Sequence, residues 1–164
     1  MDKKEIEVLQ ILEKDAKTTT EMIAKMVDLT IDETSSIVKR LEENKVILGH
    51  STLIDWSKVS GNDGVTAMID VKVTPIRGVG FDKVAERIYR FPEVKAVYLM
   101  SGAYDLSVSI EGKTMAEIGR FISEKLSTLD SVVSTTTHFI LKKYKHDGVV
   151  FDEGEDDRRI VVTP

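Results

Sequence analysis

The sequence predicts an α+β protein made of two small units, the first helical and the second built from strands and helices. Apolar residues recur with helical spacing up to about residue 45, whereas the period-two alternation typical of strands begins only after residue 64. Between these regions lies Ser57–Gly64, SKVSGNDG, a polar stretch of turn-forming residues. We therefore expect one domain over residues 1–60, a second over residues 61–150, and an acidic tail over residues 151–164, in which Ile160–Val162 could add an edge strand.

Three short helices are expected in the first domain. The first covers Lys3–Asp15, and the second and third open at Thr18 and Thr30, each followed three residues later by a glutamate. This Thr-x-x-Glu spacing is the capping box, in which both side chains bind free backbone N–H groups at the start of a helix. Only a short turn separates the last two helices, which predicts a helix-turn-helix. The apolar stretch Val46–Trp56 then looks like two strands of a wing, or a wing plus a strand that leaves the domain.

The second domain is expected to form around a hairpin, Val94–Ile110, with a short glycine-containing connection between its two β-rich runs. A strand over Val65–Val73 and a helix precede it, and a helix that opens at Thr114 and a strand over Val132–Tyr144 follow it. The order βαββαβ, with helices long enough to cross a four-stranded sheet, is the ferredoxin-like arrangement.

Alternation in the hairpin predicts which side chains share a face of this sheet. Tyr104 should lie on the face of Leu106 and the apolar residues that follow, with Asp105 and the serines on the other face. Both helices should cover one face only. Three large apolar side chains are expected on the open face: Met68, Tyr98 and Ile140. Because such a patch is larger than monomers usually expose, we expect a homodimer through this face.

Composition bounds the function. There are no cysteines, which excludes disulfides, thiolate metal sites and thiol nucleophiles and fits a reducing interior. No apolar run approaches the roughly 20 residues of a membrane span, and the charged N-terminus is unlike a secretory signal, so we expect a cytoplasmic protein. The net charge of −5 argues weakly against nucleic-acid binding, although residues 65–150, with 12 basic and 10 acidic residues, are net positive.

The sequence offers little for catalysis. The three histidines stand in separate segments without metal-ligand spacing, and no hydrolase, zincin or P-loop motif is present, so we expect no metal and no cofactor. Gly78 and Gly80 precede a helix, which is better explained by flexibility at the helix entry than by a phosphate site. Asp105 is either a solvated turn residue or a ligand-binding carboxylate, and the residues alone leave both open.

The outer face of the third helix is the best candidate for DNA contact. Ser35 and Ser36 can hydrogen-bond to phosphates or base edges, and Lys39 and Arg40 supply positive charge. Acidic residues on the same helix weigh against this surface, and Glu43 has no capping role to explain it. The candidate DNA-binding residues are Thr30, Ser35, Ser36, Lys39, Arg40 and His50.

The two halves together resemble the Lrp/AsnC family of transcription regulators. The resemblance rests on the helix ending Val38–Glu42, on Val46–His50 and on the β-loop-β segment Leu99–Asp105. It implies a winged helix-turn-helix that binds DNA, a second domain that senses a small molecule, usually an amino acid, and dimers that often assemble into rings. The candidate effector-binding residues that it implies are Ser101, Gly102, Ala103, Tyr104 and Asp105, with Thr135 and Thr137 on the last strand.

Three positions depart from the family's pattern. Asp28 stands where the turn usually has glycine, Ile37 replaces a common arginine, and Ala103 replaces a common acidic residue. The sequence therefore allows two alternative functions besides that of an effector-responsive regulator. One is an enzyme like the siroheme decarboxylases, which resemble this family but need basic or imidazole groups that scattered histidines do not supply. The other is a protein-interaction module with a vestigial winged helix, which the net acidity allows.

Overall fold

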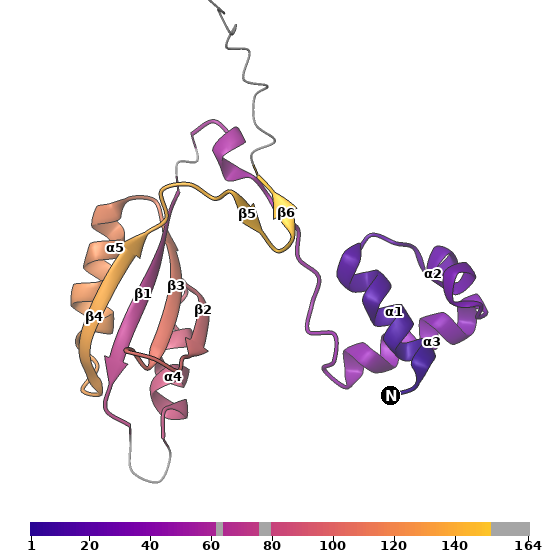
Figure 1. Cartoon of the computed structure of the whole chain (residues 1–164), viewed down its shortest axis with the longest axis horizontal. Coiled ribbons are helices and arrows are strands. Elements are labelled where there is room, and N and C mark those ends of the chain that lie inside the picture. The colour runs from indigo at the N-terminus through magenta and orange to yellow at the C-terminus, as the bar shows by residue number, and fades with distance from the viewer. Residues whose placement is uncertain (62–63, 76–79, 152–164) are drawn as a thin grey trace, which may run out of the picture. The chain divides into compact units, whose positions relative to one another are not determined.

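The computed structural model describes residues 1–61, 64–75 and 80–151, and divides the chain into two compact units, Met1–Ile54 and Asp55–Pro164 (Figure 1). Each unit has a hydrophobic core of its own. Two predictions fall outside the described residues: the role of Gly78 before its helix and the edge strand at Ile160–Val162.

The first unit consists of three helices, as predicted: α1 (Lys3–Lys14), α2 (Thr20–Val27) and α3 (Ile31–Glu43). They pack around a core cluster of Val8, Ile23 and Val27. Ile31, although apolar, does not join this core, since its side chain is 50% exposed. Ile31 is the first residue of α3, directly after the turn, and it lies outside the part of the helix that packs against α1 and α2.

The capping box of α3 is confirmed. The Thr30 hydroxyl accepts a hydrogen bond from the Glu33 N–H at 3.2 Å, and the Glu33 carboxylate accepts one from the Thr30 N–H at 2.9 Å. The Thr30 hydroxyl also donates to that carboxylate, and these hydrogen bonds hold the pKa of Glu33 below its usual value. The box therefore fixes where the third helix begins.

The capping box predicted at Thr18 is wrong by one residue. Thr19 caps α2 instead, with its hydroxyl accepting from the Met22 N–H at 3.3 Å. Two threonines in succession offer alternative caps, and packing of the α2 apolar face selects between them. After α2 the chain turns at Asp28, whose φ of 54° lies in the left-handed region that a short polar side chain tolerates.

The structure does not contain the predicted strands of a wing. From Val46 to Asp55 the described chain carries no strand, and the next element is a single 3₁₀ turn at Trp56–Lys58. Leu48 in this stretch is 86% exposed. A ribbon of two short strands is marginal in water unless a third strand or a helix packs against it, and the single chain supplies neither here.

The second unit has the predicted βαββαβ order. Its elements are β1 (Val65–Val73), α4 (Asp82–Tyr89), β2 (Val94–Leu99), β3 (Leu106–Gly112), α5 (Met115–Phe121) and β4 (Val132–Phe139). The four strands form one antiparallel sheet in the order β2-β3-β1-β4. This is the ferredoxin-like arrangement, which confirms the predicted fold.

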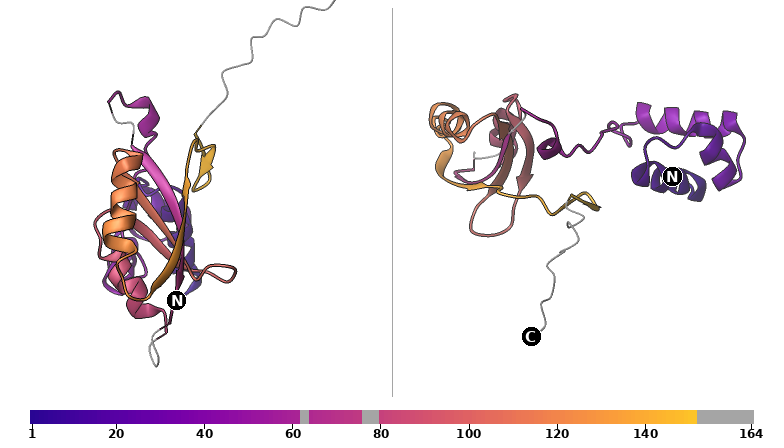
Figure 2. Two further views of the ribbon diagram at one scale, coloured as in Figure 1. Left: turned by 90° about the vertical axis from the view of Figure 1, so that its left-hand side faces the viewer. Right: turned by 90° about the horizontal axis from the view of Figure 1, so that it is seen from above.

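Both helices cover the same face of the sheet, as Figure 2 shows in its left-hand view. The alternate residues of β1 from Ala67 to Val73 are all buried on that face, as are Leu106, Val108 and Ile110 of β3. Helix residues close this core: Val84 and Ile88 from α4, and Ile118 and Phe121 from α5. Burial of each such side chain stabilises the folded state by roughly 1.5–3 kcal/mol. The opposite face of the sheet carries polar residues and isolated apolar ones.

The last strand is shorter than predicted. β4 ends at Phe139, and a small hairpin of β5 (Lys145–His146) and β6 (Val149–Val150) follows it. Asp147 and Gly148 form its turn with φ values of 44° and 78°. An Asp-Gly pair with two positive φ angles is typical of the type I′ turn that joins the strands of a two-residue hairpin. The Asp-Gly pair in the sequence therefore predicts this hairpin, which the sequence analysis did not include.

Candidate functional site

The outer face of α3 is exposed, as the candidate DNA surface requires. Ser35, Ser36, Lys39 and Arg40 all lie on the exposed side, while Thr34 and Leu41 of the same helix are buried. The 3.6-residue period separates the two sets, because the buried residues recur at the spacing that returns a side chain to the same face. The structure therefore brings the four predicted residues to one surface.

Two of the candidate hydroxyl groups already have partners in the fold. Thr30 belongs to the capping box, and the Ser36 hydroxyl donates to the Asp32 carbonyl at 2.8 Å. A hydroxyl that donates within the helix can still accept a hydrogen bond. Ser36 remains suited to a partner that donates, such as a base amino group.

Arg40 forms an ion pair that the sequence analysis missed. Its guanidinium group donates to the carboxylate of Glu5 on α1, and Glu5 is only 7% exposed. The other oxygen of Glu5 accepts the Asp2 N–H at 2.7 Å in a capping box of its own. The Asp-x-x-Glu spacing of that box was visible in the sequence, but its tertiary partner was not. Arg40 therefore connects two helices as well as lying on the candidate DNA surface.

The other two basic candidates, Lys39 and His50, lie near acidic side chains. Lys39 lies 3.9 Å from Glu43 on the same helix, and His50 Nε2 lies 3.6 Å from the Glu42 carboxylate. All four side chains are about half exposed or more. Ion pairs of this kind contribute little and exchange readily with other charges. Lys39 is therefore the cation of α3 that a phosphate can engage at least cost to the fold.

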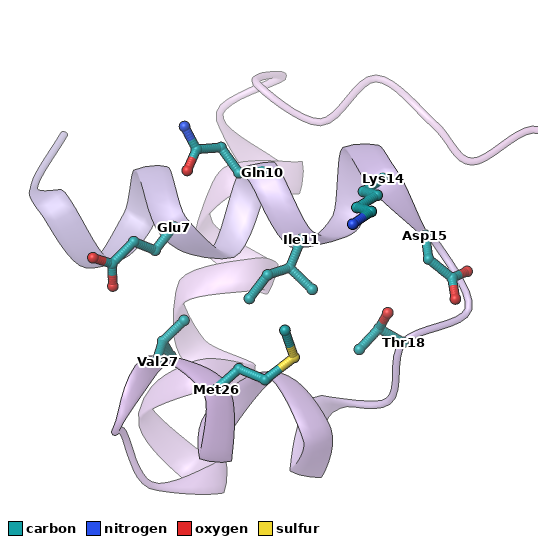
Figure 3. A pocket seen from close by; sticks show the side chains of 8 residues that line it. All are labelled: Glu7, Gln10, Ile11, Lys14, Asp15, Thr18, Met26 and Val27. Carbon is teal, nitrogen blue, oxygen red and sulfur yellow. The ribbon is translucent and has the colours of Figure 1, made fainter. Parts of the chain in front are cut away.

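Hollows lie on the surface of the first unit. One, of about 420 Å³, opens between α1 and α2, where Ile11 and Met26 face each other and Glu7, Lys14 and Asp15 stand around them (Figure 3). It has no part of α3 in its lining. Another, of about 470 Å³, is lined by basic, acidic, hydroxyl and apolar residues: Asp2, Lys4, Leu29, Asp32, Glu33, Ser36, Ile37 and Arg40. Lys4, which donates to the Val27 carbonyl, is a cation beside α3 that the sequence analysis did not single out.

In the second unit, the loop between β2 and β3 projects from the sheet on the side away from the helices (Figure 2, left). Gly102 in this loop has a φ of 156°, and a Cβ built there would meet no atom of the described chain within 4 Å. Its missing side chain therefore does not serve close packing. The main chain near Gly102 is open to approach by another molecule.

Asp105 is held firmly by β1. Its N–H donates to the Val71 carbonyl at 3.1 Å, and its Oδ2 accepts from the Val73 N–H at 2.9 Å. Its Oδ1 lies 3.6 Å from the Lys72 ammonium, and the carboxylate side chain is only 19% exposed. Asp105 is therefore no solvated turn residue. Lys72, which the sequence analysis did not select, also donates to the Ala103 carbonyl at 3.4 Å.

The prediction that Tyr104 shares the face of Leu106 is wrong. The Tyr104 hydroxyl lies 2.7 Å from the Thr136 hydroxyl, and Thr136 is opposite Asp70, on the face away from the helices. Strand alternation does not extend to residue 104, because β3 begins only at Leu106. The loop therefore meets β4 through a threonine that was not selected.

Thr135 and Thr137 lie on the other face. They pair with Val71 and Ile69, whose side chains are buried under the helices. The structure therefore does not bring these two hydroxyl groups together with the Ser101–Asp105 loop. In a run of three threonines along a strand, the first and third side chains lie on one face of the sheet and the second lies on the other. The sequence alone did not indicate which of the two faces the loop contacts.

The open face of the sheet carries the predicted apolar residues among polar ones. Met68 lies on it, and Tyr98 is 56% exposed. Asp70 and His138 lie side by side there, with His138 Nε2 3.2 Å from the Asp70 carboxylate. Ile140 follows the end of β4, where its N–H donates to the Thr66 carbonyl at 2.9 Å.

Among residues 1–61, 64–75 and 80–151, no cluster of three or more histidine, cysteine or acidic side chains could hold a metal ion. Within the same residues, no helix has the length and apolar character needed to cross a bilayer.

Family models match both units. Residues 1–47 match the model described as winged helix-turn-helix DNA-binding, and residues 66–150 match the Lrp/AsnC ligand binding domain. A DNA-binding winged helix joined to a ligand-binding domain defines a transcription regulator, which is not an enzyme. The chain belongs to the Lrp/AsnC family of transcription regulators.

Relatives and solved structures agree with this assignment. The HTH-type transcriptional regulator YugG of Bacillus subtilis is 63% identical over 164 residues, which are 100% of this chain and 99% of that protein. The HTH-type transcriptional regulator FL11 of Pyrococcus furiosus is 30% identical and covers 88% of this chain and 90% of its own length. A Neisseria meningitidis transcriptional regulator in complex with L-Met has a TM-score of 0.71 at 23% identity, covers 89% of this chain and 93% of its own, and shows the shared fold.

Proposed function

We propose that this regulator responds to an amino acid bound at the Ser101–Asp105 loop. The observation that carries the proposal is the pair of acceptors in this loop, the Asp105 carboxylate and the Ala103 carbonyl, which already hold an ammonium group, that of Lys72. An amino acid brings an ammonium and a carboxylate, so its site needs acceptors of this kind beside main-chain N–H donors. The open main chain near Gly102 offers such donors.

The similar Neisseria regulator, whose structure contains L-Met, supports an amino acid as the class of effector. We assign effector binding and assembly to residues 61–150 and DNA binding to residues 1–60, with the outer face of α3 in contact with DNA. Lys39 supplies charge at this surface and Ser35 and Ser36 supply hydroxyl groups. Because its target is DNA, we place its action in the cytoplasm.

We further propose that two chains pair through the open face of the sheet. In the part of the chain that the structure describes, the helices of this unit cover the opposite face (Figure 2). The open face carries Met68 and Tyr98. A two-fold axis through this face covers the same patch on both copies. Dimers of this kind that bring their β2–β3 loops together would close a ring, in which each loop faces a neighbouring dimer.

Calorimetry with a panel of L-amino acids on the parent protein and on Asp105→Asn tests the proposed effector site. The asparagine keeps an acceptor for the Val73 N–H but loses the negative charge, so the fold should persist while amino-acid binding is lost. DNA sequences selected from a random pool should bind both proteins without effector, and only the parent should change its affinity when the amino acid is added. Equal amino-acid binding by both proteins would remove Asp105 from the site.

A further inference from the structure

We infer that Lys72 is an internal competitor at the effector site: its ammonium group occupies the acceptors that an amino-acid ammonium group takes, and an effector binds by displacing it. This inference rests on the proposed function and adds how the site is kept closed in the absence of effector. Its geometric basis is that one ammonium contacts both acceptors, Asp105 Oδ1 at 3.6 Å and the Ala103 carbonyl at 3.4 Å.

The two oxygens of Asp105 have separate tasks. Oδ2 accepts a hydrogen bond from the main-chain N–H of Val73 at 2.9 Å, at the point where the pairing of β1 with β4 shifts register between Lys72 and Val73. Among the residues that the structure describes, Oδ1 contacts the Lys72 ammonium, at the longer distance of 3.6 Å. A ligand ammonium can therefore replace the Lys72 contact on Oδ1 while the bond that holds the strand stays intact.

The contact of Lys72 is also of the kind that a ligand can displace. Its side chain is 46% exposed, so water already reaches the ammonium and can solvate it when it leaves. The side chain of Lys72 lies on the open face, in the alternation of Met68 and Asp70 along β1, and contacts the loop at Asp105 and Ala103. Its departure frees Asp105 Oδ1 and the Ala103 carbonyl, while the hydrogen bond from the Val73 N–H to Asp105 Oδ2 remains.

Displacement has a consequence for selectivity. A ligand without an ammonium group has nothing to offer Asp105 in exchange for Lys72, so it must either bind beside the occupied acceptors or leave the carboxylate unpaired. Lys72 therefore favours amino acids over the corresponding carboxylic acids, and it sets a threshold concentration below which the regulator stays in its effector-free state.

The test measures affinity in the full-length parent and in Lys72→Met, which keeps the aliphatic stem and removes the charge. The probes are the proteinogenic L-amino acids and, for each one that binds, the carboxylic acid that lacks its ammonium group. Removal of an exposed competing ion pair should tighten amino-acid binding about two- to fivefold. Lys95→Met is the matched control, because Lys95 forms a similar pair with Glu111, at 3.8 Å on the same sheet and away from the loop.

Amine acylation followed by mass spectrometry gives a second readout in the parent protein. Saturation with the amino acid should speed modification of Lys72, which leaves its acceptors, and should leave Lys95 unchanged. Slower modification of Lys72, together with weaker binding by Lys72→Met, would show that Lys72 holds the effector carboxylate and would overturn the inference. Unchanged affinity in Lys72→Met would overturn it as well.

The outcomes separate this inference from the proposed function. If the parent binds an amino acid, Asp105→Asn does not, and Lys72→Met binds no tighter than the parent, the effector site stands and the competitor role falls. If neither the parent nor Lys72→Met binds any amino acid, both fall together.

Discussion

Arg40 has a task within the fold besides its place on the candidate DNA surface. Its substitution by alanine removes the guanidinium group from Oε1 of Glu5, a residue that is 7% exposed, while the Asp2 N–H and the Met1 ammonium, 3.8 Å away, stay at the other oxygen. We expect Arg40→Ala to lower the free energy of unfolding by about 1 to 3 kcal/mol, the usual penalty for an unsatisfied buried polar group. Urea unfolding measures this. The neighbouring Lys39→Ala is the control, and its free energy of unfolding should stay within about 0.5 kcal/mol of the parent value. An equal loss of stability in both variants would show that the Arg40–Glu5 ion pair does not stabilise the fold.

Glu93 gives the second unit a predicted sensitivity to acid. Its carboxylate accepts a hydrogen bond from the Lys125 ammonium, which lowers the pKa of Glu93 although partial burial acts in the opposite direction. A carboxylate with a lowered folded pKa stabilises the fold above its unfolded pKa, near 4.5, and this contribution disappears as the pH falls through the folded pKa. Urea midpoints measured from neutral pH down to about pH 3 should therefore fall less steeply for Glu93→Gln than for the parent. Lys125→Met should flatten the same part of the curve, and a parent-like slope in both variants would contradict the assignment.

At the scale of elements, α3 can be tested through salt dependence. Lys39 is the cation of this helix that can be removed without breaking a buried pair, so Lys39→Gln should reduce the slope of log affinity for DNA against log salt by about one unit. Fluorescence anisotropy at several salt concentrations gives this slope. Lys83→Gln, an exposed lysine of α4 in the other unit, is the matched control. If both variants share the parent slope, Lys39 does not contact a phosphate.

Elements were predictable from the sequence wherever one face is buried against a core. The alternation of Val65–Val73 and the helical period of α3 report such burial directly, and the structure confirms both. The two strands predicted over Val46–Trp56 are not formed, because an apolar stretch alone does not make a strand, which also needs a neighbour to pair with. Contacts between distant segments, such as Arg40 with Glu5 or Tyr104 with Thr136, have no local signal at all.

At the scale of the whole molecule, the open sheet face decides assembly. Tyr98→Asp puts a charge into the proposed interface, so light scattering at micromolar concentration should report a dimer for the parent and a monomer for the variant. Tyr89→Asp on α4 is a closely matched control, since Tyr89 is 57% exposed and Tyr98 is 56% exposed. A dimer in both variants would place the interface elsewhere, and a monomeric parent would leave the open face without a partner copy.

The position of β1 in the middle of the sheet determines when the sheet of the second unit can form during synthesis of the chain. β1 is the first strand of the sheet to be synthesised, yet its neighbours β3 and β4 emerge from the ribosome later. Ala67 of β1, for example, cannot complete its pairing until Phe139 of β4 has been synthesised. The first unit, whose helices contact near neighbours in the sequence, can fold before β1 has found a partner. The nascent protein therefore carries a finished DNA-binding unit while the apolar side of β1 is still unpaired, and this interval is its period of greatest exposure to aggregation.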